Sequence, residues 1–220
     1  MPRRSYDQYC AVARALDVVG DRWTLLIARE LLAGPRRYTD LHADLPGVST
    51  DMLATRLKDM ERDGLAERRR LPAPASAYVY ELTERGRGLL PVLRALGEWG
   101  APELAERRPT DAVRAHWLAL PLARQLEALG ESGAVEVRVD EGVFHVRVGG
   151  EPKHPVHPAR PVYGDGAYPD GEPDARLTLG EEVCGEVARG VVGLVEAVRG
   201  GHVTVTGDGA LAKALRGGTS

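Results

Sequence analysis

Apolar residues recur at intervals of three and four over four successive segments near the N-terminus. The segments cover residues 9–19, 22–33, 38–45 and 49–63, and each has the pattern of an amphipathic helix. Pro46–Gly47 separates the last two segments by a tight turn. Two helices joined in this way, the second with a polar face, predict a helix-turn-helix.

The segment at residues 49–63 carries a signal at each end. The Ser49 hydroxyl can accept a hydrogen bond from a free backbone N–H of the first turn, and Gly64 suits the position after the last turn. Asp21 is predicted to cap the helix at 22–33 in the same way as Ser49. The apolar positions on one face of 49–63 are Leu53, Leu57 and Met60. We therefore expect a capped helix whose polar face is available to a partner.

Residues 65–82 change from the helical period to alternation. The first part, 65–71, is short and rich in arginine, residues 72–77 form a proline-containing tip, and residues 78–82 alternate as a strand. A β-hairpin that directly follows an amphipathic helix is the order of elements in a winged helix.

Thr83 is predicted to cap a further helix that runs to about Ala105. Its apolar side chains are expected to point inward: Leu89, Val92, Leu93, Leu96 and Trp99. This apolar side is wider than one small domain can cover, which indicates a partner chain. Arg107–Arg108–Pro109 has the composition of a linker, so we expect two domains, at residues 1–108 and 109–220.

The second domain contains both strand and helix patterns. A strong hairpin signal lies in the alternating residues of 135–139 and 144–148. The other expected elements are an amphipathic helix at 110–129, a long Gly- and Pro-rich loop at 149–173, a strand at 175–179, a helix at 181–199 that is weakened at 190–193, a strand at 202–206 and a closing helix at 209–216. The chain is thus predicted to be α+β, a winged helix followed by a small α+β domain.

The chain has a net charge of −3, but its two halves differ in the sign of their net charge. Residues 1–108 hold 18 Lys and Arg against 16 Asp and Glu, whereas residues 109–220 hold 11 against 16. Cations cluster at Arg36–Arg37 and at residues 68–70, and such clusters suit a polyanion. The two cysteines have no metal-ligand spacing, and no apolar run approaches the ~20 residues that span a bilayer. We expect a cytoplasmic protein without a disulfide framework, cofactor or metal.

Several short motifs lie between residues 9 and 103. They are Tyr9-Cys10, Gly20-Asp21-Arg22-Trp23-Thr24-Leu25-Leu26, Leu32-Ala33-Gly34-Pro35-Arg36-Arg37-Tyr38, Leu45-Pro46-Gly47-Val48-Ser49, Leu53, Arg56-Leu57, Gly64-Leu65 and Tyr80-Glu81-Leu82-Thr83. Together these motifs resemble those of the HxlR-type winged-helix regulators, relatives of the MarR group. The resemblance implies a transcription regulator, most simply a repressor, that binds an inverted-repeat operator in double-stranded DNA as a homodimer.

The region from Thr110 onward resembles a sterol-carrier-protein-like domain. The resemblance rests on Ala175–Leu179, a helix, and then Gly200–Asp208. It implies helices packed on a sheet around an apolar cavity, which would suit a small apolar effector. Candidates for the cavity lining are Trp117, Phe144 and Val146, and the alternative for all three is plain core.

The helix at 49–63 is expected to enter the major groove of DNA, where Arg56 would pair with guanine and Asp51 would accept from cytosine. The wing tip lacks a cation, so the stem arginines are expected to contact phosphates instead of the minor groove. The candidate DNA-binding residues are Arg36, Arg37, Ser49, Thr50, Asp51, Met52, Thr55, Arg56, Lys58, Arg68, Arg69, Arg70 and Ser76. One alternative is that these charges only solvate one face of the helix, and another is that the fold docks a protein. A third is a small-molecule or lipid-binding protein in which the winged helix serves dimerisation.

Cys10 is a candidate redox residue, because thiol-sensing HxlR relatives carry a cysteine at the corresponding position. Arg14, one helical turn later, is expected to lower the pKa of the thiol, and the alternative is a small residue without a role. His154 and His157 lack the further ligands of a metal site, and His145 is expected on the exposed hairpin face. The sequence shows no recognisable pairing of a catalytic nucleophile with a general base and no phosphate-binding loop. We therefore expect that the protein is not an enzyme.

Overall fold

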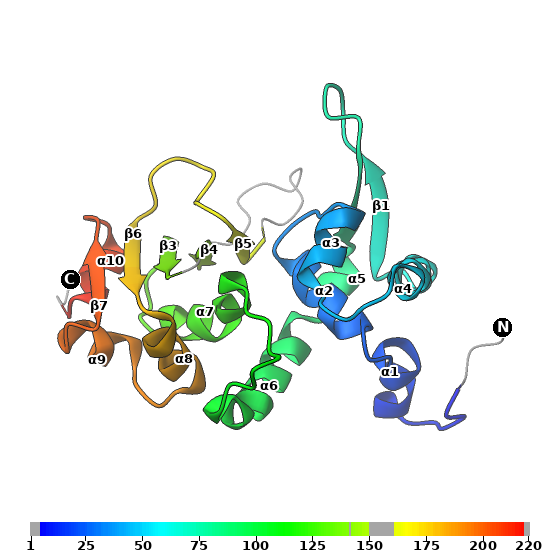
Figure 1. The fold of residues 1–220 in the computed structure, drawn as a ribbon, viewed down its shortest axis with the longest axis horizontal. Helices are drawn as coiled ribbons and strands as arrows, with labels where there is room; N and C mark the ends of the chain where they lie inside the picture. The colour runs from blue at the N-terminus through cyan, green and yellow to red at the C-terminus, as the bar shows by residue number, and fades with distance from the viewer. Residues whose placement is uncertain (1–4, 141, 150–160, 218–220) are drawn as a thin grey trace. The chain divides into compact units, whose positions relative to one another are not determined.

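The computed structural model describes residues 5–140, 142–149 and 161–217, and the chain forms two units, Met1–Leu93 and Arg94–Ser220 (Figure 1). His154, His157 and most of the expected loop at 149–173 lie outside the described residues. The domain boundary at residues 108 and 109 stays a prediction.

Four helices open the first unit: α1 (Ala11–Val19), α2 (Thr24–Leu32), α3 (Tyr38–Asp44) and α4 (Thr50–Arg62). The expected second helix begins later than predicted, because Trp23 and not Asp21 is its N-cap residue. Asp21 instead accepts the Trp23 N–H at 3.0 Å through Oδ1, in the turn before the helix. The order of helices predicted from apolar spacing is otherwise confirmed.

Both predicted ends of α4 are confirmed. The Ser49 hydroxyl oxygen accepts the Met52 N–H at 3.2 Å, and Gly64 adopts the left-handed conformation with φ of +68°. Leu53, Leu57 and Met60 are at most 1% exposed, which places the apolar stripe in the core of the unit. The side of α4 opposite this stripe is left to solvent.

The wing follows α4 at once, as predicted. Strands β1 (Ala66–Arg70) and β2 (Tyr78–Leu82) pair antiparallel, with Arg68 opposite Tyr80. Tyr80 also exchanges two backbone hydrogen bonds with Arg36, at 3.0 and 2.8 Å, which joins the segment between α2 and α3 to the wing. The base of the hairpin is therefore tied to the helices.

The prediction of a single helix at residues 84–105 is wrong. Thr83 does cap a helix, since its hydroxyl oxygen accepts the Gly86 N–H, but α5 (Glu84–Arg87) is short and is followed by α6 (Leu90–Gly100) and a 3-10 helix at Ala101–Ala105. Pro91 lacks the N–H that a continuous helix would donate to the Arg87 carbonyl, so the helix breaks there.

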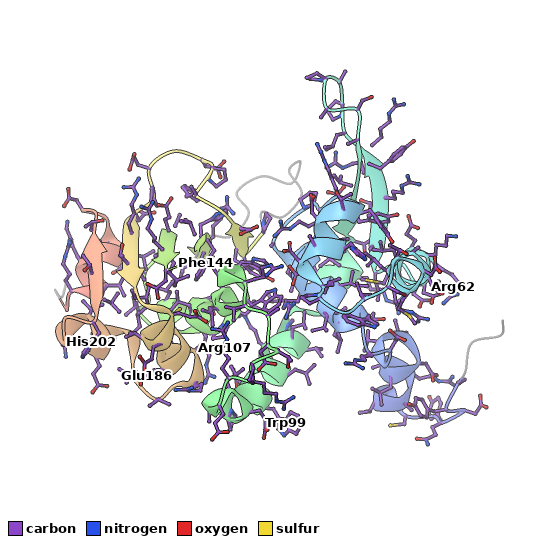
Figure 2. All side chains as sticks on the ribbon, viewed as in Figure 1. Arg62, Trp99, Arg107, Phe144, Glu186 and His202 are labelled. Atoms are coloured by element: carbon purple, nitrogen blue, oxygen red, sulfur yellow. The ribbon has the colours of Figure 1, made fainter. Side chains whose placement is uncertain are left out.

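The inward orientation predicted for the apolar side chains of this region is also wrong for the single chain. No residue of α6 is buried. Val92 is 43% exposed and Leu96 44%, and Leu89 and Leu93 are only half-buried. Trp99, which Figure 2 labels, is 83% exposed. Within the described residues this apolar helix face is left uncovered, and such a face is typical of a contact with another chain.

The second unit contains a five-stranded sheet in the order β5-β4-β3-β6-β7. Its strands are β3 (Gly133–Val139), β4 (Gly142–Val148), β5 (Tyr163–Asp165), β6 (Ala175–Leu179) and β7 (Val203–Thr206). Only the pairing of β3 with β6 is parallel among the described strands. The helices of this unit are the 3-10 helix Ala115–Leu118, α7 (Ala119–Glu127), α8 (Glu181–Arg189), α9 (Leu194–Arg199) and α10 (Ala210–Leu215). Figure 1 shows α7 and α8 on the same side of the strands.

Two predictions for this unit are wrong. The helix expected at 110–129 is confined to α7 and the short turn before it, because Pro121 cannot donate to the Trp117 carbonyl and fits only the first turn of a helix. The segment 149–173 was expected to be loop, yet it contains β5, which pairs with β4. A strand of three residues is too short to show a period.

The expectation that His145 is exposed is wrong as well. Its side chain is buried, with Nδ1 3.1 Å from the Gly166 carbonyl oxygen and the ring edge-on to Tyr168. Glu136 on the neighbouring strand accepts the Tyr168 N–H, so the segment after β5 covers this face of the sheet. Burial lowers the pKa of His145. Alternation along a strand identifies its two faces but not what covers each one.

We expect Gly86→Ala to destabilise the first unit, because a Cβ at this position would lie 1.9 Å from the Leu65 carbonyl oxygen. The cost should be about 2 kcal/mol of unfolding free energy. Gly185→Ala in α8, where nothing lies within 4 Å of the added Cβ, is the matched control and should stabilise slightly. Thermal unfolding measures both, and a Gly86→Ala protein that melts like the wild type would contradict the packing.

Candidate nucleic-acid interface

The solvent side of α4 is polar and continuous. Its exposed residues include Thr50, Asp51, Met52, Thr55 and Lys58. The Thr55 hydroxyl donates to the Asp51 carbonyl at 2.8 Å, so this side chain lies flat on the helix. The Ser49 hydroxyl oxygen accepts the cap hydrogen bond from the Met52 N–H, and its own O–H can still donate to a ligand.

Both ends of α4 are fixed by side chains from other elements. The Tyr38 hydroxyl of α3 donates to the Thr50 carbonyl at 2.7 Å. At the other end, Arg85 of α5 donates to the Asp63 carbonyl at 2.6 Å, and the Thr83 hydroxyl donates to the Gly64 carbonyl at 2.6 Å. The exposed face of α4 is therefore presented by a helix that is held at its start and at its end.

Arg56 differs from the other candidates on this helix. Its Nη1 lies 3.4 Å from Asp21 Oδ2 and 3.1 Å from Asp59 Oδ2, and its side chain is 24% exposed. The sequence predicted a guanidinium directed at a base edge. In the structure the guanidinium lies between two carboxylates of the protein.

The arginines of the wing stem are exposed and ordered by neighbours on the same hairpin. The Arg68 guanidinium lies 4.0 Å from the centroid of the Tyr78 ring, and Arg70 Nη2 donates to Ser76 Oγ at 3.1 Å. Arg69 forms a two-point ion pair with Glu81, at 2.6 and 3.3 Å, which raises its pKa. Among the described residues, Arg69 forms an ion pair with a carboxylate, whereas Arg68 and Arg70 form none.

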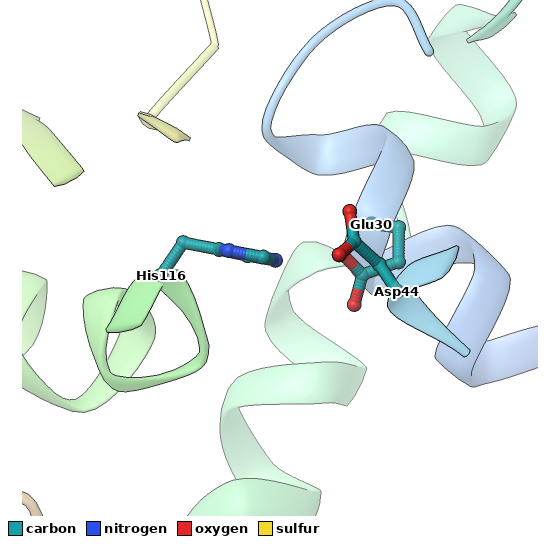
Figure 3. Close-up of side chains that lie close together, drawn as sticks. All are labelled: Glu30, Asp44 and His116. Atoms are coloured by element: carbon teal, nitrogen blue, oxygen red, sulfur yellow. The ribbon is translucent and has the colours of Figure 1, made fainter. Parts of the chain in front are cut away.

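Arg36 and Arg37 have different surroundings. Arg36 Nη1 lies 3.9 Å from Asp44 Oδ2 and its side chain is 15% exposed, whereas Arg37 is exposed. Figure 3 shows Asp44 beside Glu30 of α2, and oxygens of these two carboxylates lie within 4.8 Å of each other. The third residue labelled there, His116, belongs to the second unit. Arg37 is therefore the more accessible cation of this pair.

The two cysteines have opposite environments. Cys10 is exposed at the N-cap position of α1, where the backbone N–H groups of Ala13 and Val12 lower the pKa of its thiol. The predicted help from Arg14 is not the cause, and Arg14 lies 3.7 Å from Asp17. Cys184 is buried, and burial raises the pKa of its thiol to about 12. Of the two thiols, Cys10 is the one exposed to solvent.

The cavity candidates of the second unit lie mostly in its packed interior. Phe144 (Figure 2) and Val146 are fully buried, and Trp117 is half-buried. A pocket of about 240 Å³ in this unit has both polar and apolar walls, and none of the three residues lines it. Among the described residues, none of the helices has the length and apolar character needed to cross a membrane.

A family profile described as HxlR-like helix-turn-helix matches residues 18–108. The uncharacterised HTH-type transcriptional regulator YvaP of Bacillus subtilis is 35% identical over 86 residues, which are 39% of this chain and 80% of that protein. The HTH-type transcriptional regulator YodB of the same organism is 36% identical over 99 residues, 45% of this chain and 86% of YodB.

The solved structure of the reduced form of YodB matches 47% of this chain and 100% of the YodB chain, with 33% identity and a TM-score of 0.39. A structure of quinone-bound YodB covers 41% of this chain and 96% of its own, with 32% identity and a TM-score of 0.36. The residues that the family profile matches include α2, α3, α4 and the wing. On the sequence identity to YvaP and YodB and their coverage, the chain belongs to the HxlR-like helix-turn-helix family.

Proposed function

We propose that this protein is a DNA-binding transcriptional regulator, a homodimeric repressor that recognises an inverted-repeat operator. The observation that carries the proposal is α4, a helix held at both ends with an exposed polar face and followed at once by an arginine-stemmed hairpin. Membership in a family of helix-turn-helix proteins, with relatives named as transcriptional regulators, supports it.

In the proposed complex the first turns of α4 enter a major groove. The Asp51 carboxylate can accept a hydrogen bond from the amino group of cytosine, and the methyl groups of Thr50 and Thr55 can contact thymine. Lys58, further along the same face, would reach a phosphate. Specificity would then depend on short polar side chains at the start of α4.

The wing would supply electrostatic affinity. Arg68 and Arg70 extend from β1 without a carboxylate partner among the ion pairs of the described residues, so each can neutralise a phosphate. Arg69 is paired with Glu81 and contributes less net charge. Because the tip at residues 72–77 has no cation, the stem is the part of the wing that meets DNA.

Exposed apolar side chains support a dimer. On or next to α1 they are Tyr9, Val12 and Leu16, and on α6 and the turn after it they are Val92, Leu96, Trp99 and Leu104. Two copies related by a twofold axis would bury these side chains and present two copies of α4 to a palindromic site.

The second unit is proposed as the place where a small effector acts. Its sheet with helices packed on it is consistent with a sterol-carrier-like arrangement, and its pocket of about 240 Å³ is large enough for a small molecule. Since Phe144 and Val146 fill the interior, an apolar effector would have to displace packed side chains. Trp117, which is half-buried, is the more accessible of the three candidates.

We expect the protein to bind DNA from upstream of its own gene in a gel shift, with an affinity that falls steeply with salt. Arg68→Ala should weaken binding to all sequences and lower the slope of log affinity against log salt by about 1, because one phosphate contact is lost. Lys213→Ala, an exposed cation on α10 of the second unit, is the matched control and should bind like the wild type. The absence of sequence-selective binding, or equal effects of the two variants, would overturn the proposal and favour a small-molecule-binding protein.

Leu96→Asp should convert the dimer into monomers, because a carboxylate would be buried against apolar side chains of the partner copy. A penalty of about 3 kcal/mol corresponds to an increase of more than about 100-fold in the dimer dissociation constant. Val191→Asp is the control, since Val191 is 64% exposed on the turn between α8 and α9. Analytical ultracentrifugation measures both, and a wild-type protein that stays monomeric at micromolar concentration would contradict the dimer.

The exposure of Cys10 at the start of α1, together with its lowered pKa, favours thiol sensing as a second mode of control. Alkylation by iodoacetamide at neutral pH should modify Cys10 and leave the buried Cys184 intact, as peptide mass mapping would show. The modified protein should lose affinity for its operator, whereas Cys10→Ser should be insensitive to the reagent. Unchanged operator binding after complete modification of Cys10 would rule out this mode.

A further inference from the structure

We infer that Asp21 and Arg56 form a positioning pair, which fixes the orientation of α4 toward the operator without contacting it. The inference rests on the proposed DNA binding and assigns to Arg56 a role other than base recognition. The evidence is that the Asp21 carboxylate, in the turn before α2, contacts both the start of α2 and the middle of α4.

The two oxygens of Asp21 have separate partners. Oδ1 accepts the Trp23 N–H at 3.0 Å at the start of α2, and Oδ2 lies 3.4 Å from Arg56 Nη1 in the middle of α4. A carboxylate is planar and rigid, so the two contacts fix the beginning of α2 and the middle of α4 relative to each other. Tyr38 and Arg85 hold the ends of α4, and Asp21 adds a third point between them.

Arg56 is held from its own helix as well. Its Nη1 lies 3.1 Å from Asp59 Oδ2, and the other oxygen of Asp59 lies 2.8 Å from Arg62 Nη1. Asp21, Arg56, Asp59 and Arg62 therefore form a row of alternating charges (Arg62 is labelled in Figure 2). A guanine contact by Arg56 would require its guanidinium to leave both carboxylates.

Helical geometry places Arg56 at the flank of α4 and not on its outer face. Arg56 precedes Leu57 and follows Leu53 by three residues, so its side chain emerges beside the buried stripe. Asp51 and Thr55 emerge on the opposite side. The exposed fractions agree, since the Arg56 side chain is 24% exposed whereas that of Arg62, on the outer face, is 57% exposed.

The turn that carries Asp21 is itself tightly constrained. A Cβ at Gly20 would lie 2.5 Å from the Leu16 carbonyl oxygen of α1, so the chain passes close to the end of this helix. Asp21 follows directly, and the pair thus connects the end of α1 to the middle of α4. A displacement of α1, which carries the proposed dimer contact and Cys10, would reach α4 through this connection.

The sign of the effect of Asp21→Asn tests the inference. Asparagine keeps an oxygen for the Trp23 N–H but loses the ion pair with Arg56. If Arg56 read a base, loss of a nearby negative charge would free the arginine and tighten DNA binding. A positioning role predicts the reverse, a loss of operator affinity of about 10-fold with little change for non-specific DNA. Glu61→Gln, an exposed carboxylate on the same helix, is the matched control.

The variant Arg56→Ala and the double variant complete the experiment. The double variant should lose about 10-fold and not about 100-fold, because both changes break the same contact. The slope of affinity against salt should stay at the wild-type value for all three, since no phosphate contact is removed. A thermal unfolding measurement on each variant should show that it is folded under the conditions of the gel shift.

The outcomes separate the inference from the proposed function. A wild-type protein without sequence-selective binding overturns the proposed function and the inference together. A wild-type protein that binds its operator, with an Asp21→Asn variant that binds as tightly or more tightly, overturns the inference alone. A salt slope lowered by about 1 in Arg56→Ala would likewise overturn it, by assigning Arg56 to a phosphate.

Discussion

Burial of the apolar stripe of α4 determines which side of this helix meets solvent. Leu53, Leu57 and Met60 are almost fully removed from water, and each such side chain contributes about 1.5–3 kcal/mol. A rotation of α4 about its axis would expose these three side chains to water. Their burial therefore keeps the opposite, polar side of the helix directed toward solvent. The caps, the Tyr38 contact and the Asp21 contact refine an orientation that the hydrophobic effect has already selected.

The first unit was predictable where its signals are local. The Ser49 cap, Gly64 after the last turn and the hairpin at residues 65–82 depend on neighbours within a few residues, and all three are confirmed. The environment of Arg56 was not predictable, because its partner Asp21 is 35 residues away and belongs to another element. The sequence identified the helix that carries the candidate site but not which of its side chains are already engaged.

The errors in the remainder of the chain have the same origin. His145 alternates with buried valines and looks exposed, yet a segment some 20 residues later covers it. Trp99 has the period of a buried position and is exposed, because none of the described residues covers the apolar face of α6. Helical and strand periods describe one element at a time, whereas burial depends on the other elements and on partner chains.

The central claim is that two copies of α4 lie in successive major grooves. Hydroxyl-radical footprinting of the full-length protein on its own upstream region tests this most directly. The account predicts two protected stretches related by a twofold axis, with centres one helical turn, ~34 Å, apart. A single protected stretch, or uniform weak protection along the fragment, would contradict it.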